Sequence, residues 1–169
     1  MKKLIASLLA LLCVTAALTS PASVMAANKE YAATETCIVV AGETKQVQLL
    51  HVFDDGSQLF VGMPIVTVQT RGSLTAQKPL YHRNSSGTIL WTATVTGTFT
   101  YNGSTSSCIS ASYSTQISNN NWSEQSGTAY PSGNSAIADV VMMRKLLFIV
   151  VETVPVTITL TCDKNGNLS

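Results

Sequence analysis

The 169-residue chain contains few charged side chains: ten Lys and Arg residues, nine Asp and Glu residues and two His residues. The basic residues form no cluster, so the sequence shows no positively charged patch of the kind that binds nucleic acid. No acidic tail suggests a cationic partner. Ser, Thr, Asn and Gly supply most of the polarity. This composition is typical of an extracellular β-protein and excludes nucleic acid as the expected partner.

The chain also lacks the residue patterns that most enzyme sites need. His51 and His82 are the only histidines available as the base of a nucleophilic triad, and neither lies near a cysteine or the other histidine in the metal-ligand spacing. Asp54 and Asp55 are adjacent carboxylates, but they diverge on an extended chain, and Asp-Asp-Gly is first of all a turn sequence. No glycine-rich loop for phosphate occurs. We therefore predict no enzymatic activity, no catalytic residue, no metal site and no cofactor.

No amphipathic helix is evident after residue 26, and the longest apolar run, Leu4–Leu18, lies near the N-terminus. Two lysines precede this run, and small residues end it before Ala27, which predicts a bacterial secretory signal peptide cleaved between Ala26 and Ala27. A transmembrane anchor is the weaker interpretation, because a span needs ~20 apolar residues. Removing residues 1–26 leaves eight basic and nine acidic residues, a net charge of −1. We expect a secreted, extracellular protein with no stable membrane span.

Cysteine is scarce: after residue 26 only Cys37, Cys108 and Cys162 remain. Export permits a disulfide, and an odd count leaves one thiol over, so three pairings are open. Cys108 and Cys162 each lie in or follow a strongly strand-like segment, which favours their pairing and leaves the partner of Cys37 undefined. Closing that loop of about 54 residues would contribute roughly 4 kcal/mol by the chain-entropy estimate.

The most regular pattern that is present runs from Thr88 to Gly103. Its apolar residues alternate with threonines over most of its length. Successive strand side chains point to opposite faces, so the pattern predicts a long strand with Trp91 facing the core and threonines facing outward. Asn102 and Gly103 then predict a hairpin turn. A three-residue connection or a bulge near Asn102–Ser104 would return the next apolar residues to the Trp91 face: Ile109, Ala111 and Tyr113.

Shorter strand-like segments lie on both sides of this stretch. They cover 37–40, 44–53, 58–61, 65–70, 136–144 and 154–162. An Asp-Asp-Gly-Ser turn at 54–57 predicts a hairpin between the second and third of them. Two polar segments, 73–87 and 118–135, are expected to be long surface connections, the first with at most a short edge strand near Leu80 and Tyr81.

About seven to nine strands separated by Gly, Asn and Pro predict an all-β protein. We expect a single immunoglobulin-like antiparallel β-sandwich over residues 36–169, preceded by a flexible mature N-terminus at 27–35 and by the cleavable signal peptide. The likeness is one of architecture only. In a true immunoglobulin domain the tryptophan lies between the two cysteines, whereas Trp91 precedes Cys108 and Cys162.

Two aromatic side chains and one apolar segment are the candidate contacts for a ligand or partner. Trp122 and Tyr130 lie in a polar segment, where an exposed ring can stack on a sugar or anchor a protein; alternatively, Trp122 folds back as a lid on one end of the sandwich. Val140–Val151 is expected to form a hairpin with Leu147 and Phe148 near its tip, in place of ordinary turn residues. We expect the sandwich to cover this tip; the alternative is a contact with a second copy or another protein.

From Trp91 onward the chain resembles a group of small exported all-β proteins of Gram-positive bacteria that has no established function. The resemblance covers about the last 80 residues and depends on these motifs: TVTGTFTYNGS at 94–104, Asn-Trp-Ser at 121–123, Ser-Gly-Asn at 132–134, the apolar hairpin, and TLTCDKNGNLS at 159–169. It implies secretion and a Cys108–Cys162 pair, and it brings no catalytic residue.

These patterns together predict a secreted, non-enzymatic binding or adhesion protein that contacts an unknown protein or carbohydrate at the cell exterior. A secreted hydrolase acting on glycans is an alternative, but it would need carboxylates brought together from distant strands. A self-assembling or membrane-active protein is a second alternative, which would use the Val140–Val151 hairpin. The sequence does not define the ligand or the oligomeric state.

Overall fold

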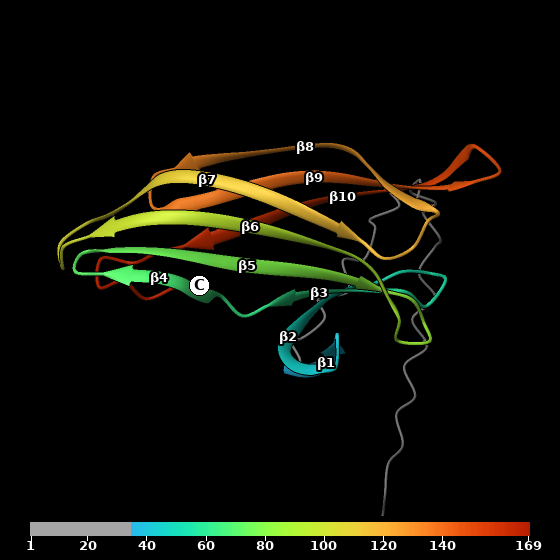
Figure 1. Ribbon diagram of the computed structural model, residues 1–169, viewed down its shortest axis with the longest axis horizontal. Helices are drawn as coiled ribbons and strands as arrows, with labels where there is room; N and C mark the ends of the chain where they lie inside the picture. The colour runs from blue at the N-terminus through green and yellow to red at the C-terminus, as the bar shows by residue number, and fades with distance from the viewer. Residues whose placement is uncertain (1–34) are drawn as a thin grey trace, which may run out of the picture. The chain divides into compact units, whose positions relative to one another are not determined.

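The computed structural model describes residues 35–169, which form two antiparallel β-sheets and no helix (Figure 1). The larger sheet has the strand order β1-β2-β3-β5-β6-β7, with β4 also paired to β5, and the smaller has the order β10-β9-β8.

The prediction of an all-β, antiparallel fold is confirmed, and the two sheets are consistent with a β-sandwich. The predicted signal peptide, its cleavage site and the predicted N-terminal segment up to residue 34 lie outside the described residues. The strand bounds are β1 Glu35–Val40, β2 Glu43–Val52, β3 Gln58–Gly62, β4 Ile65–Thr70, β5 Ser73–Arg83, β6 Ile89–Tyr101, β7 Ser106–Ile117, β8 Trp122–Ser132, β9 Ser135–Leu146 and β10 Ile149–Thr161.

Strand β6 has the conformation that its period of two predicts. Trp91, Val95 and Phe99 are fully buried between the sheets, while the threonines between them are only partly buried. Gly97 lies on the same inner face, where a Cβ atom would come within 2.7 Å of the Cβ of Ala136 on β9. A glycine at this position therefore lets the two sheets approach each other.

The predicted bulge after β6 exists, but it lies farther along the chain than expected. Tyr101 pairs with Ser106 across a four-residue loop, and the register then shifts in β7, where Cys108 pairs with Phe99 and Ser110 with Thr98. The extra residue is Ile109, which is 58% exposed. The prediction that Ile109 faces the core is therefore wrong. The loop already places Cys108 on the inner face, so the bulge turns Ile109 outward before Ala111 and Tyr113 return to the core side.

The prediction of a surface connection at 73–87 is wrong, because residues 73–83 form β5, a strand inside the larger sheet. It pairs with β6 along one side and with β3 and β4 along the other. Lys78 and Pro79 interrupt the strand-like pattern of the sequence, which led to the prediction of a loop. In the structure they lie between the part of β5 that pairs with β3 and the part that pairs with β4, so neither residue has a partner on that side. A proline that lacks an N–H is tolerated at such a gap in the ladder.

The second predicted connection, 118–135, is also largely strand. Residues 122–132 form β8, which pairs only with β9 and therefore lies at an edge of the smaller sheet. Most β8 side chains beyond Trp122 are exposed or half-buried. A strand that faces solvent over much of its surface shows no apolar alternation, which explains why the sequence pattern missed it.

The buried apolar side chains form two clusters. The main core lies between the sheets and draws on β3 and on β5 to β10. A smaller cluster on the outer face of the larger sheet consists of Ile38, Val47, Phe60 and Tyr81. Strands β1 and β2 contribute to this second cluster, and Figure 1 shows them curling at the edge of the sheet beside β3.

Candidate functional site

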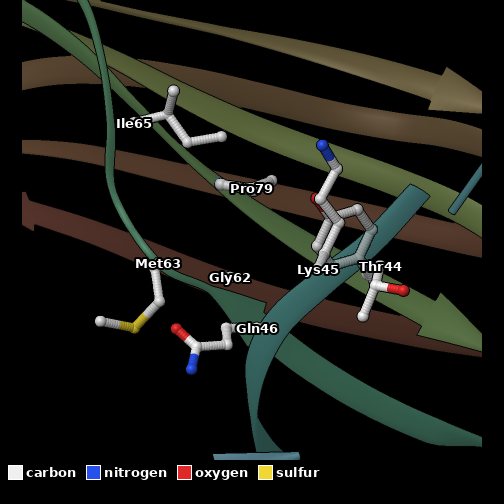
Figure 2. Close-up of a pocket in the computed structure, with 8 residues that line it drawn as sticks. Thr44, Lys45, Gln46, Gly62, Met63, Ile65 and Pro79 are labelled. Atoms are coloured by element: carbon white, nitrogen blue, oxygen red, sulfur yellow. The ribbon is translucent and has the colours of Figure 1, made fainter. Parts of the chain in front are cut away.

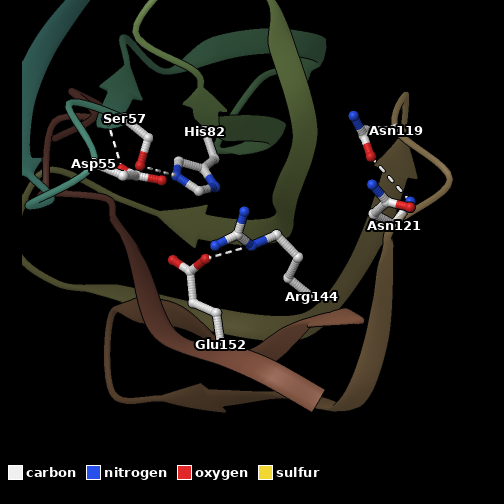
Figure 3. A network of polar contacts seen from close by, with 7 residues as sticks. All are labelled: Asp55, Ser57, His82, Asn119, Asn121, Arg144 and Glu152. Carbon is white, nitrogen blue, oxygen red and sulfur yellow. Dashed lines mark hydrogen bonds and ion pairs between the residues drawn. The ribbon is translucent and has the colours of Figure 1, made fainter. Parts of the chain in front are cut away.

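Polar side chains from both sheets meet at the end of the sandwich where β5 finishes and the β9–β10 hairpin begins (Figure 3). Asp55 and Ser57 come from the β2–β3 turn, and His82 from β5. Arg144 of β9 and Glu152 of β10 approach from the smaller sheet. We call these five residues the end cluster.

The β2–β3 turn holds Ser57 in place through its own backbone. The Ser57 N–H donates a hydrogen bond to Asp55 Oδ1 over 2.9 Å, and the Phe53 N–H donates to the Ser57 carbonyl over 2.9 Å. Gly56 has a φ of 78°, which a glycine adopts without strain. The Asp-Asp-Gly-Ser signal thus forms the predicted turn, and the same turn delivers Ser57 to His82. The hydroxyl group and the backbone N–H of Ser57 both favour the ionised form of Asp55 and lower the pKa of its carboxyl group.

Ser57 and His82 make the contact nearest to catalytic geometry in the part of the chain that the structure describes. The Ser57 Oγ lies 3.2 Å from His82 Nε2, and both side chains are buried. In a nucleophilic triad, a carboxylate accepts a hydrogen bond from the other ring nitrogen of the histidine. Here Asp55 binds Ser57 instead, and His82 Nδ1 has no hydrogen-bond partner among the described residues. The arrangement cannot orient His82 as the base of a triad.

Aromatic rings enclose the imidazole and exclude water from it. The His82 ring centroid lies 5.1 Å from those of Phe53 and Trp91 and 5.0 Å from that of Trp122, whose ring is perpendicular to it. Burial lowers the pKa of His82 to about 4; Asp55 acts in the opposite direction, and Arg144 lowers it further. His82 is consequently a neutral, structural side chain at neutral pH.

An ion pair closes the end cluster on the side of the smaller sheet. Arg144 Nε lies 2.8 Å from Glu152 Oε2, at an angle that leaves both atoms without a hydrogen bond. A cavity of about 240 Å³ adjoins this pair. The residues that line it are Phe53, Asp54, Asp55, Arg144, Val151 and Glu152. The cavity is therefore bounded by the β2–β3 turn and by the base of the β9–β10 hairpin.

The sequence did not predict this cluster. His51, the other candidate base, is exposed at the end of β2, where its ring packs against Phe53. Asp54 is also exposed, and only Asp55 of the carboxylate pair takes part in the network. A signal for burial of His82 was nevertheless present, because Leu74, Ala76 and Leu80 share its parity.

The two aromatic candidates have different environments. Trp122 is buried against His82 and Trp91, with 6.0 Å between the two indole centroids. Its alternative role as a lid on one end of the sandwich is correct, and a direct role in stacking on a ligand is wrong. Tyr130 is 42% exposed, and its hydroxyl donates a hydrogen bond to Asp139 over 3.1 Å. Tyr130 remains a candidate for contact with a partner.

The hairpin tip between β9 and β10 is uncovered. Leu147 is 90% exposed and Phe148 99% exposed, so the expectation that the sandwich covers them is wrong. The physical reason is that β9 and β10 stay paired up to Leu146 and Ile149, which holds the two-residue turn away from the core. Figure 1 shows this turn extending beyond the start of β8.

The backbone at the tip is strained. Leu147 has a φ of 49° and Phe148 a φ of 71°. Two-residue hairpin turns with positive φ at both positions normally contain Asn and Gly, because a side chain with a Cβ costs roughly 1–2 kcal/mol there. Leu and Phe have neither the conformational freedom nor the local hydrogen bonds that offset this cost. The tip therefore combines strain with exposure of two large apolar side chains.

Cys108 and Cys162 are both buried in the main core, as free thiols in this structure, and Cys37 is exposed. The backbone N–H groups of the two buried cysteines donate to neighbouring carbonyls of one turn, Cys108 to Gly133 over 2.8 Å and Cys162 to Asn134 over 3.0 Å. Burial raises the pKa of both thiols, and Cys108 adds to the rise at Cys162. The fold thus brings the two thiols to the same end of the core, and their pairing stays a prediction.

A second cavity, of about 150 Å³, lies on the outer face of the larger sheet (Figure 2). Its lining residues are Thr44, Lys45, Gln46, Gly62, Met63, Ile65, Pro79 and Tyr81. Lys45 is the charged side chain among them, and it is already paired with Glu43. The cavity lacks the converging polar groups that fix a small ligand.

No protein-family model, curated protein or solved structure matches the chain. Within residues 35–169 no group of three or more His, Cys, Asp or Glu side chains is placed to hold a metal ion. No helix among the described residues is long and apolar enough to cross a membrane. The assignment of a function therefore depends on the geometry of the end cluster and the hairpin tip.

Proposed function

We propose that this protein is a secreted, non-enzymatic binding protein, built on an immunoglobulin-like β-sandwich, which contacts its partner at the cell exterior through the β9–β10 hairpin tip. The observation that carries the proposal is the exposure of Leu147 and Phe148 at a turn with positive φ. Secretion is part of the proposal, and the apolar run and the cleavage pattern at Ala26 and Ala27 support it.

The energetics of the tip favour a contact with a partner. Transferring a Leu or Phe side chain from water to an apolar environment is worth roughly 1.5–3 kcal/mol, so two such side chains are a substantial source of binding energy. The free protein gains no burial from these residues and also bears the strain of the turn. Strained backbone together with a projecting apolar patch is typical of recognition sites.

The end cluster supports a binding role over a catalytic one. Aromatic rings enclose Ser57 and His82, and Asp55 accepts its hydrogen bond from the Ser57 N–H and none from the imidazole. The cluster instead supports the base of the hairpin, because Arg144 and Glu152 belong to the two strands that carry the tip. Its role in the proposal is to hold the hairpin in one orientation.

The proposal is tested by the double substitution Leu147→Ser and Phe148→Ser. The mature chain, residues 27–169, is labelled with a fluorophore and titrated onto intact bacterial and animal cells. We expect saturable binding for the wild type and at least about tenfold weaker binding for the double variant, because two exposed apolar contacts are lost. The melting temperature should not fall, since neither side chain is buried in the free protein.

The matched control replaces two exposed isoleucines outside the β9–β10 hairpin, Ile109→Ser and Ile117→Ser on β7, and should bind cells like the wild type. Wild-type affinity in the tip variant would show that the contact lies elsewhere. Absence of saturable binding by the wild type to any cell surface would contradict the binding function itself.

A further inference from the structure

We infer that the partner of the hairpin tip is a lipid bilayer surface, into which the tip inserts as a short apolar wedge. The inference depends on the proposed function, since it names the partner of the same contact. Three features of the tip distinguish lipid from a protein partner: the distribution of its apolar side chains, its length and the charges around it.

The first feature is that the tip is apolar on every side. Adjacent residues of a strand point to opposite faces, so a hairpin that docks on a protein usually has one apolar and one polar face. Here six consecutive residues are exposed and apolar, on both faces and at the turn: Leu146, Leu147, Phe148, Ile149, Val150 and Val151. Hydrocarbon surrounds an inserted wedge on all sides and matches this pattern, whereas a protein groove would leave one face in water.

The second feature is the length of the apolar part. Lys145 pairs with Val150, and the turn residues Leu147 and Phe148 each lie two positions beyond this pair, one on either side of the hairpin. At a strand rise of ~3.3 Å per residue, the backbone of the tip extends roughly 7 Å past Lys145. Interfacial protein segments are buried about 5–10 Å into the boundary between headgroups and acyl chains. The Lys145 ammonium would then lie at the level of the headgroups.

The base of the hairpin is held firmly enough for insertion without rearrangement. The Lys145 N–H donates a hydrogen bond to the Asn121 carbonyl over 2.7 Å, which joins the hairpin to the start of β8. Arg144 and Glu152 form their ion pair one step below Lys145, and Figure 3 shows both side chains at the base of the hairpin. The turn is thus presented in a fixed geometry.

The third feature is the balance of charge around the tip. Lys145 is exposed on the hairpin, and the exposed Asp54 and Asp55 lie at the neighbouring β2–β3 turn. Attraction of the lysine to an anionic lipid is therefore opposed by the two carboxylates. Apolar insertion has to supply the affinity, so binding should depend little on anionic lipid or on salt.

A second copy of the chain is a poorer partner. Association of two copies through a sheet would use an open edge, and β10 is the edge strand that continues into the tip. Pro155 lies within β10 and has no N–H to donate. Lys78 reaches from β5 and donates a hydrogen bond to the Thr159 carbonyl over 3.0 Å, which occupies a second position on this strand.

The experiment places a fluorescent probe at the tip by the substitution Phe148→Trp. Trp91 and Trp122 are buried and supply a constant background, so the new indole reports on the tip alone. The mature chain is mixed with protein-free vesicles of phosphatidylcholine, with and without phosphatidylglycerol. We expect emission from the new tryptophan to move to shorter wavelength and to be quenched by lipids brominated near the headgroup end of the acyl chain.

The matched control carries Tyr130→Trp, a half-exposed aromatic position on β8, and should show neither change. In flotation assays the Leu147→Ser and Phe148→Ser double variant should need at least about tenfold more lipid for half-maximal binding. The two vesicle compositions should give affinities within about threefold of each other, because apolar burial is independent of lipid charge.

Several results would overturn the inference. If the tip variant loses binding to cells while the wild type ignores vesicles, the proposed function stands and the partner is a protein or a glycan. If the wild type sediments as a dimer that the tip substitutions dissociate, a second copy covers the tip. Binding only to anionic vesicles, abolished by salt, would show that charge and not apolar insertion provides the affinity. If neither cells nor vesicles are bound, the proposed function fails as well.

Discussion

His82 is removed from water by the fold and retains one hydrogen-bond partner, Ser57. The cause is its pairing with Trp91 across β5 and β6, which puts the imidazole against an indole and beneath Trp122. A neutral imidazole tolerates this environment, because a single hydrogen bond satisfies one of its nitrogens and the ring faces are apolar. A protonated imidazole does not, since its charge would be buried without a carboxylate in contact with it.

This difference predicts a loss of stability in mild acid. The pKa of His82 is about 4 in the folded protein and about 6.5 in the unfolded chain, so between these values the unfolded state binds more protons. The free energy of unfolding should therefore fall as the pH decreases from 6.5 to 4, by up to about 3 kcal/mol, and His82 should add nothing further below pH 4. The lowered pKa of Asp55 affects stability only in a more acidic range.

Urea denaturation across this pH range measures the effect. The substitution His82→Gln should lower stability at pH 7 but flatten the dependence between pH 6.5 and 4. His51→Gln, at an exposed position, should retain the wild-type slope. An unchanged slope in His82→Gln would show that another group is responsible for the acid sensitivity.

At the scale of elements, the two ends of the sandwich are closed by different means. One end has the end cluster, with its ion pair, and the aromatic rings that enclose His82 in edge-on and tilted orientations. At the other, β7 and the end of β10 converge on the turn at 133–134, where Ser106 donates a hydrogen bond to the Cys162 carbonyl over 2.6 Å. Cys108 lies on β7, two residues from Ser106, and Cys162 directly follows β10, so each of the converging segments contains a cysteine.

We expect Cys108 and Cys162 to be joined in the exported, oxidised protein. Mass spectrometry of a non-reduced digest should find the two peptides linked, and Cys37→Ser should leave that link intact because Cys37 is exposed on β1. Reduction should lower the free energy of unfolding by up to about 4 kcal/mol, the chain-entropy value for a loop of this length. A bond from Cys37 to either buried cysteine would contradict the assignment.

At the scale of the whole described domain, the open edges of the sheets determine whether the chain stays monomeric. Strand β10 has thirteen residues and pairs only with β9, so its free edge is a template for pairing with another chain. Pro155 interrupts the row of donors on this strand. The Lys78 ammonium reaches across the sandwich to the Thr159 carbonyl, and its burial lowers the pKa of the lysine.

Removing both features should promote association through this edge. The double variant Lys78→Ala and Pro155→Val should form dimers or larger species in sedimentation velocity at concentrations where the wild type is monomeric. Lys164→Ala, at an exposed position in the C-terminal turn, is the control for the loss of one charge. A double variant that stays monomeric would show that β10 needs neither residue to avoid self-pairing.

The accuracy of the strand predictions from the sequence depends on how much of each strand is exposed to solvent and on how regularly it is paired. The alternation around Trp91 and the turn at 54–57 depend on local rules of side-chain direction and backbone conformation, and both predictions were correct. Strand β5 was missed because Lys78 and Pro79 interrupt its apolar alternation. Both residues are accommodated in the strand because they lie at the gap between β3 and β4, where no ladder hydrogen bond is needed. Strand β8 was missed because an exposed edge strand needs no apolar face.

The sequence by itself determined the all-β class, the central strand, the β2–β3, β6–β7 and β9–β10 hairpins and the apolar character of the β9–β10 tip, since each depends on residues close together in the chain. The tertiary structure alone decided that the tip stands free and that His82, Trp91 and Trp122 share one buried cluster. Those features depend on strand register and on the packing of one sheet against the other. Strand register is set by contacts between residues far apart in the chain. No local sequence pattern therefore shows which distant side chains contact one another or which stay exposed.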